Sequence, residues 1–308
     1  MEKYIGPLFI FLFVLLSSFR DVFYGSTFQH VSFFFLIGLS FSLASFVFFP
    51  FSLWKAPRDL RILFRHWPEI LALNVTTALA WLAYFSAIKW IEPAIVNTIW
   101  SGLGPLILLL FSWTGFGERE KLHSIDKIAQ IGVLSSILYL VWIVLSQRSG
   151  LPTTQITQSI LGLIATLVSA TFIIISVVLS KKLNVLKVGA EAIVGTRFLL
   201  LALVSFAFIW IENGALVTIG QFAFLGGLAL LMIVLPIYLF QAGLQRSSNF
   251  TAEAITALGP IFVFIVQLFD DRLVFSYHSL VAISFYSLSC SGAVWARLRV
   301  LSISIRST

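Results

Sequence analysis

Charge, cysteine and histidine are scarce in this chain of 308 residues. Charged residues make up 11% of it, whereas a soluble domain carries roughly a quarter. The single cysteine, Cys290, leaves no disulfide framework and no cysteine metal cluster within the chain. The 4 histidines lie near the ends of the helices predicted below, so we expect neither a metal site nor a histidine base.

Apolar residues take the place of charge. They make up 59% of the chain, the mean hydropathy is +1.01, and they form continuous runs of about 20 residues, the length that spans a bilayer. Because hydrocarbon supplies no water to backbone amides, such runs must be helices or closed barrels, and unbroken runs indicate helices. We predict an all-α integral membrane protein with ten transmembrane helices, at residues 4–25, 30–52, 67–89, 93–114, 125–146, 157–180, 188–211, 218–243, 248–269 and 277–297.

The basic residues set the direction of the chain. If both termini are cytoplasmic, 15 of the 20 Lys and Arg residues lie at cytoplasmic ends, and only Lys89, Arg148 and Arg272 lie at the opposite ends. Cytoplasmic loops are enriched in Lys and Arg. We therefore predict a multi-pass protein of the inner (plasma) membrane with cytoplasmic N- and C-termini. Anionic lipid accounts for the net charge of +7, so no nucleic-acid partner is expected.

The two halves of the sequence match each other. Three short segments recur in the same order: Gly104-Pro105 as Gly259-Pro260, His123-Ser124 as His278-Ser279, and residues 37–41 as residues 194–198. This pattern predicts two five-helix repeats, residues 1–150 and 151–308. Because five is odd, the second repeat enters the membrane from the opposite side. Such inverted repeats let one half rock against the other and expose a central site to each side in turn.

Several segments resemble the EamA-like proteins of the drug/metabolite transporter superfamily, over nearly the full length. The matching segments are Tyr84 to Lys89, Ser101 to Pro105, Gly117-Glu118, Gly195 to Phe198, and Leu258 to Pro260. The resemblance implies an inverted five-plus-five repeat, a central cavity, and export or exchange of small metabolites without ATP hydrolysis. The chain departs from the family pattern at two places. Ser40 stands where an arginine is expected in the second helix, and Asp270-Asp271 where an acid is expected after the ninth.

Two prolines and four charged residues stand out inside the predicted spans. Pro105 and Pro260 lie at matched mid-helix positions, where a proline frees a carbonyl and kinks the helix, so a role in gating or cavity shape competes with a static bend.

Charges at such depth should face protein or water. Arg20 and Asp21 are expected to form a cavity wall that attracts an anion, or else an interfacial cap. Adjacent residues point about 100° apart, so they are not expected to form one simple pair. The Arg197 guanidinium needs a hydrogen-bond acceptor, and Glu253 is the candidate because it lies at a similar depth. Arg197 is expected either to lock the structure or to contact the substrate or a proton directly.

Aromatic and amide side chains form the predicted binding site. Trp81 and Tyr84 share a helix face, as do Asn97 and Trp100, at a similar depth. Together they can stack on a flat ligand and orient a polar group, although aromatic packing against lipid is the alternative. The repeat adds three residues from the second half, namely Tyr238, Glu253 and Thr256.

These features favour a secondary transporter, an exporter of a small polar or amphipathic metabolite. The family resemblance implies an amino-acid-like compound or an organic anion as the cargo. Glu253 is the candidate for proton coupling, because burial can raise a carboxyl pKa towards neutrality. We expect no cofactor, and a monomer or a homodimer. An enzyme acting on lipid or peptide would need a nucleophile and base at matching depth, which we do not find. A sensor or partner protein is disfavoured by the absence of soluble domains.

Overall fold

The protein is helical throughout the part that the structure, a computed structural model, describes: residues 2–114, 124–151, 155–211, 217–244, 246–247 and 249–306. The first half holds α1 (Glu2–Thr27), α2 (Phe33–Lys55), α3 (Pro57–Arg65), α4 (Trp67–Trp90), α5 (Pro93–Thr114) and α6 (Ser124–Leu145). The second half holds α7 (Ile156–Val185), α8 (Ala190–Arg197), α9 (Leu199–Ile211), α10 (Ile219–Ala229), the π-helical turn η1 (Leu230–Val234), α11 (Leu235–Leu244), α12 (Asn249–Thr256), α13 (Gly259–Gln267) and α14 (Tyr277–Arg306). Gly117-Glu118 and His123 lie outside the described residues.

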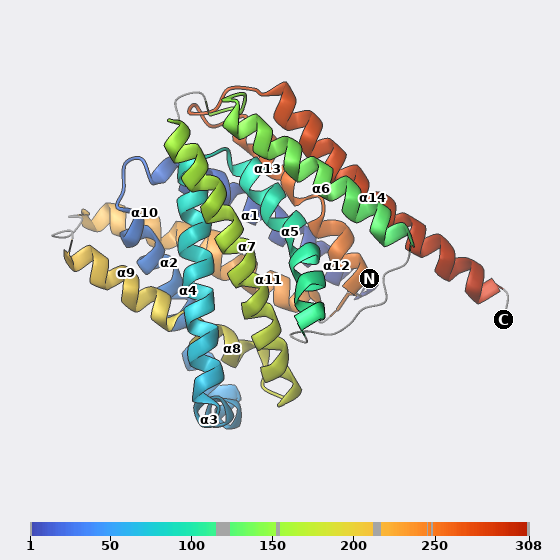
Figure 1. Cartoon of the computed structure of the whole chain (residues 1–308). Coiled ribbons are helices and arrows are strands. Elements are labelled where there is room, and N and C mark those ends of the chain that lie inside the picture. Colours follow the sequence, from blue (N-terminus) through green and yellow to red (C-terminus); the bar gives the residue numbers. More distant parts are fainter. Residues whose placement is uncertain are drawn as a thin grey trace.

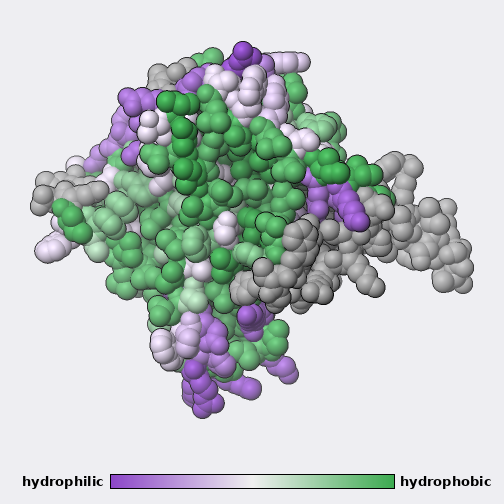
Figure 2. All heavy atoms as spheres, viewed as in Figure 1, coloured by the Kyte–Doolittle hydropathy of each residue, from purple (hydrophilic) through white to green (hydrophobic). Residues whose placement is uncertain are grey.

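The helices have the length and the surface of membrane spans. Within the described residues, 7 helical segments are long and apolar enough to cross a bilayer, and Pro93–Leu108 and Ala254–Gln267 are shorter apolar helices. Figure 2 shows an apolar belt across the middle of the molecule, between hydrophilic residues at its two ends. Large apolar side chains such as Trp210 and Phe46 are 83% and 74% exposed. Lipid is the solvent that suits such a surface.

The short helix α3 was not predicted from the sequence. It follows the break at Ala56 and begins with Pro57, which suits the first turn of a helix. Leu60 and Leu63 are 3% and 1% exposed, so α3 lies against the bundle by one apolar face. The Asp59 carboxylate accepts a hydrogen bond of 2.7 Å from the Gly189 amide, which joins α3 to the start of α8. We call this end of the bundle, at the bottom of Figure 1, the α3 end.

Matched helices of the two halves lie side by side and antiparallel. The start of α2 meets the end of α9, where the rings of Phe34 and Phe208 stack at 4.5 Å. The end of α2 meets α8, where a Cβ on Gly195 would lie 2.8 Å from the Phe49 amide nitrogen. The helices α6 and α14 pair in the same way (Figure 1): the Ser136 hydroxyl donates to the Ala282 carbonyl at 2.7 Å, and the Tyr139 hydroxyl lies 2.9 Å from His278 Nδ1.

The two matched prolines have different effects. Pro105 lies inside α5, which continues across it. Pro260 lies in the first turn of α13, after a break at residues 257–258 that separates this helix from α12. Pro105 therefore lies within a continuous helix, as predicted. Pro260 instead lies at the start of the second part of a divided helix. A divided helix leaves backbone groups free to face neighbouring helices or a cavity.

Candidate functional site

A narrow cavity lies in the middle of the bundle, between α1, α4, α5 and α7. Its volume is about 20 Å³, which is close to the space that one water molecule needs. Its walls are formed by Arg20, Ala80, Trp81, Tyr84, Trp100, Ser169 and Ile173. Three of its helices come from the first half of the chain, and α7 comes from the second. The structure thus brings four of the predicted site residues to one cavity at the boundary between the halves.

Arg20 and Asp21 form a buried ion pair. They are 8% and 0% exposed, and the Arg20 guanidinium donates from Nε and Nη2 to Asp21 Oδ1 at 2.8 and 2.7 Å. The expectation that these neighbours would not pair is therefore wrong. The long Arg20 side chain can turn back to its neighbour although the two positions point about 100° apart. Leaving either charge buried without a partner would cost more free energy than holding the side chain in this conformation.

The second oxygen of Asp21 joins α1 to α4 and α5. Asp21 Oδ2 accepts from the Tyr84 hydroxyl at 2.7 Å and from Asn97 Nδ2 at 3.1 Å. Asn97 Nδ2 also lies 3.3 Å from the Tyr84 hydroxyl oxygen. The carboxylate therefore accepts hydrogen bonds from three helices, which fixes the aromatic residues around it.

Aromatic rings complete the wall around the guanidinium. Arg20 Cζ lies 5.2 Å from the centre of the Trp81 ring and 6.0 Å from that of Tyr84, distances at which a cation attracts a ring face. The Trp100 ring meets Tyr84 edge to face at 5.5 Å. The predicted cluster of Trp81, Tyr84, Asn97 and Trp100 is thus one contiguous group. Its rings face Arg20 as well as the cavity.

Tyr238 and Thr256 do not line this cavity. Tyr238, on α11, is 53% exposed. Thr256 ends α12, where its hydroxyl donates to the Ala252 carbonyl at 2.8 Å. The Glu253 backbone is part of α12, but its side chain lies outside the described part of the structure.

Arg197 has hydroxyl partners in the described part of the chain. Its Nη2 donates to the Ser176 hydroxyl at 2.5 Å and to that of Thr77 at 3.3 Å. Arg197 ends α8, and Asn74 on α4 spans the break that follows: its Nδ2 donates to the Thr196 carbonyl, and its Oδ1 accepts from the Leu200 amide, at 3.0 and 3.1 Å. These contacts agree with a structural role for this region.

A buried carboxylate lies at the end of the bundle opposite α3. Glu92 is 0% exposed; Oε2 accepts from the Gly150 amide and the Ser279 hydroxyl, each at 2.8 Å, and Oε1 accepts from Gln267 Nε2 at 2.5 Å. Burial raises the pKa of Glu92, and these three hydrogen bonds oppose the rise. The contacts join the α4–α5 link to the segment between the halves, to α13 and to α14. We call this end the Glu92 end.

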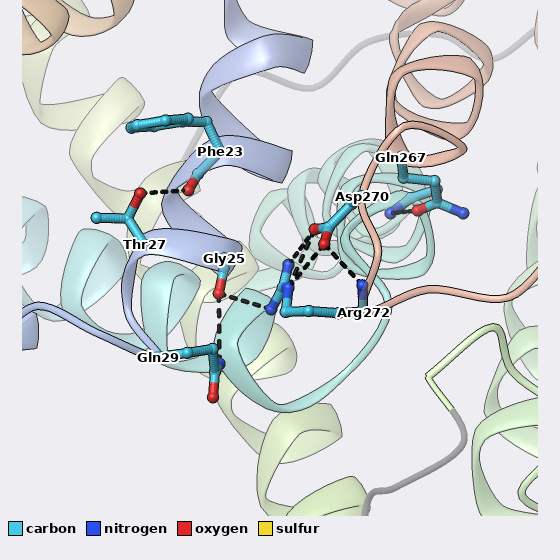
Figure 3. A network of polar contacts seen from close by, with 8 residues as sticks. Phe23, Gly25, Thr27, Gln29, Gln267, Asp270 and Arg272 are labelled. Carbon is cyan, nitrogen blue, oxygen red and sulfur yellow. Dashed lines mark hydrogen bonds and ion pairs between the residues drawn. The ribbon is translucent and has the colours of Figure 1, made fainter.

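A second polar contact closes the Glu92 end over α1. Arg272, after α13, forms an ion pair with Asp270 at 2.6 Å and donates from Nη1 to the Gly25 carbonyl, also at 2.6 Å (Figure 3). A Cβ on Gly25 would lie 2.8 Å from Arg272 Nη2, so a side chain there would displace the guanidinium. We call the Asp270–Arg272–Gly25 contact the Arg272 latch. It joins the first half of the chain to the second.

Sequence reasoning did not single out Ser169, Glu92 or Arg272 as site residues. Ser169 is one hydroxyl in an apolar helix, and nothing in its spacing marks it. Arg272 was assigned to a helix end at the membrane surface, and Glu92 lies in the short link between two predicted spans, where polar residues are ordinary. Only the packing of distant segments shows that they make specific contacts. Among the described residues, no group of three or more His, Cys, Asp or Glu side chains can hold a metal ion.

Comparisons with known proteins agree with this architecture. The EamA-like transporter family matches residues 4–150 and again residues 160–293. A search of curated proteins found no match. One crystal structure of another protein superposes with a TM-score of 0.66, at 20% sequence identity, over 96% of this chain and 98% of that one. At this identity the likeness concerns the fold alone.

Proposed function

The chain belongs to the EamA-like transporter family, and from this premise we propose that it is a secondary, ATP-independent exporter of a small polar or amphipathic metabolite. An amino-acid-like compound or an organic anion is the proposed cargo. The cavity between α1, α4, α5 and α7 is the observation that carries this proposal. It is a small aromatic chamber with a buried charged pair, lined by both halves of the chain, and small-molecule sites have this character.

The proposed mechanism is alternating access by two inverted five-helix repeats. The antiparallel pairing of α2 with α8–α9, and of α6 with α14, supports this arrangement, because these are equivalent helices of the two halves. We count ten spans by taking α8–α9, α10–α11 and α12–α13 as one span each and leaving out α3. Rocking of one half against the other would open the cavity first at one end and then at the other.

The Glu92 end is the proposed outer side. The basic residues of α3 and those at the end of α7 lie at the opposite end, as expected for a cytoplasmic face of the inner membrane with both termini inside. The Glu92 network and the Arg272 latch hold the Glu92 end together. Export would then require both contacts to separate. Proton coupling through Glu253, and a monomeric or homodimeric state, complete the proposal.

A transport screen tests the proposed function. Purified protein is reconstituted in liposomes with a broad mixture of metabolites, and release and uptake are measured by mass spectrometry in gradients of either direction. We expect at least one solute to cross faster than in empty vesicles, and Trp100→Ala and Glu253→Gln to reduce that rate while inserting normally. If no solute crosses faster than in empty vesicles, the proposal fails; wild-type rates in both variants would remove these residues from the site.

A further inference from the structure

The cavity wall has hydrogen-bond donors that the protein itself does not use. Trp100 Nε1 and the Ser169 hydroxyl are both buried without a hydrogen-bond partner, and both residues line the cavity. Arg20 donates to Asp21 from Nε and Nη2, which leaves Nη1 as its remaining group. A buried polar group without a partner costs about 1–3 kcal/mol. Two such atoms in one cavity wall, beside a guanidinium, indicate that a bound molecule completes their hydrogen bonding.

The same cavity offers a ligand almost no acceptor. A carboxylate has about four lone-pair sites, and Asp21 fills them: Oδ1 accepts twice from Arg20, and Oδ2 accepts from Tyr84 and Asn97. Among the side chains that line the cavity, only the hydroxyls of Tyr84 and Ser169 can also accept, and the Tyr84 oxygen already lies 3.3 Å from Asn97 Nδ2. An ammonium group entering the cavity would meet a guanidinium and donor groups, with no carboxylate oxygen left to receive it.

Resting on the transport function proposed above, we propose that the cavity binds its solute by an anionic oxygen group and rejects organic cations, which favours the organic anion over the amino-acid-like compound as cargo. The oxygens of the anion accept from Arg20 Nη1, Trp100 Nε1 and the Ser169 hydroxyl. The apolar body of the solute lies against Ile173 and the Trp81 ring. Ser169, on α7, is thereby assigned as a specificity-determining residue contributed by the second half of the chain. Because the donor atoms are buried, the cavity widens when the anion enters.

Three probes of similar shape but different charge show how the charge of a ligand, apart from its size, affects its affinity. Wild-type protein in lipid nanodiscs is titrated with 3-phenylpropanoate, 3-phenylpropanamide and 3-phenylpropylamine at pH 7, and binding is measured by calorimetry. We expect the carboxylate to bind at least tenfold more tightly than the amide, and the amine not to bind measurably. Binding of the amine as tight as that of the carboxylate would overturn the inference, as would equal affinity for the amide or no binding of any probe.

Two conservative variants test the assigned donors. Ser169→Ala removes one donor and keeps the shape, and Trp100→Phe removes the indole N–H and keeps an aromatic ring. Each should weaken carboxylate binding about tenfold, the effect of losing one hydrogen bond to a charged group. Ser205→Ala is the matched control, because Ser205 is likewise a buried serine without a partner but does not line the cavity. It should bind as wild type does. Wild-type affinity in both donor variants would contradict the assignment.

The outcomes separate this inference from the proposed function. If solutes cross the membrane in the transport screen but are cations, the protein is a transporter and the anion inference alone is wrong. If no solute crosses while the carboxylate binds as expected, the anion site stands and transport is wrong.

Discussion

Burying Arg20 beside Asp21 costs free energy that only full pairing offsets. Asp21 is 0% exposed and accepts four hydrogen bonds. Asp21→Asn keeps the shape but leaves the arginine cation buried without a counter-charge, which should lower the free energy of unfolding by about 3–5 kcal/mol. Tyr84→Phe is the matched control, since it removes one donor and keeps the ion pair, at a cost of about 1–3 kcal/mol. Denaturant unfolding in mixed micelles measures the free energy of unfolding of both variants. An equal decrease in the two variants would contradict the claim that the ion pair is the main stabilising interaction at this site.

Glu92 should make stability depend on pH. Its pKa is raised in the folded protein from an ordinary value of 4.5, so folding favours the protonated carboxyl. The stability that this group contributes is therefore fully present below about pH 4.5 and is lost as pH rises through the raised pKa. We expect unfolding midpoints to fall across that interval in wild type and to change less in Glu92→Gln. Glu191→Gln, at an exposed carboxylate on α8, is the control and should follow wild type.

At the scale of elements, the Arg272 latch depends on the absence of a side chain at Gly25. In Gly25→Ala the Cβ would lie 2.8 Å from Arg272 Nη2 and 3.0 Å from the Ile88 carbonyl oxygen, so the guanidinium must move. Loss of this charge-assisted bond, about 1.5–3 kcal/mol, should favour opening of the Glu92 end by about tenfold or more. A single cysteine in the cavity, Ser169→Cys with Cys290→Ser, should then react correspondingly faster with an impermeant maleimide from that end.

Gly227→Ala provides the control for this experiment. A Cβ at Gly227 would meet nothing within 4 Å, so the added methyl group tests the effect of alanine in a helix without a clash. It should leave the maleimide rate unchanged. Equal rates in Gly25→Ala and Gly227→Ala would show that the latch does not hold the Glu92 end closed.

The elements themselves were largely predictable, because lipid imposes long apolar runs that the sequence displays directly. What periodicity could not show was their interruption. The break at Phe198 is spanned by the contacts of Asn74, a residue of another helix, whereas the break at residues 257–258 directly precedes Pro260. The helix α3 is amphipathic and too short to give a span signal. In the site, the aromatic cluster could be predicted because residues three apart share a helix face. The Arg20–Asp21 pair and Ser169 could not, because side-chain reach and contacts between distant helices decide them.

At the scale of the whole molecule, the two halves meet around one cavity. Arg20, Trp81 and Trp100 come from the first half, and Ser169 comes from the second. Movement between the halves would therefore change the cavity itself. The contacts of Glu92 with Gln267 and Ser279, and the Arg272 latch, also cross between the halves at one end. In the proposed mechanism, breaking of these contacts and a change in the cavity would result from the same movement.

Exposure of the cavity to each side in turn is the central claim, and one measurement tests it most directly. The Ser169→Cys, Cys290→Ser protein is reconstituted in vesicles of known orientation and treated with an impermeant maleimide from outside or from inside. Alternating access predicts reaction from both sides, with a bound solute slowing both rates. Reaction from one side only, or rates that no solute affects, would contradict it.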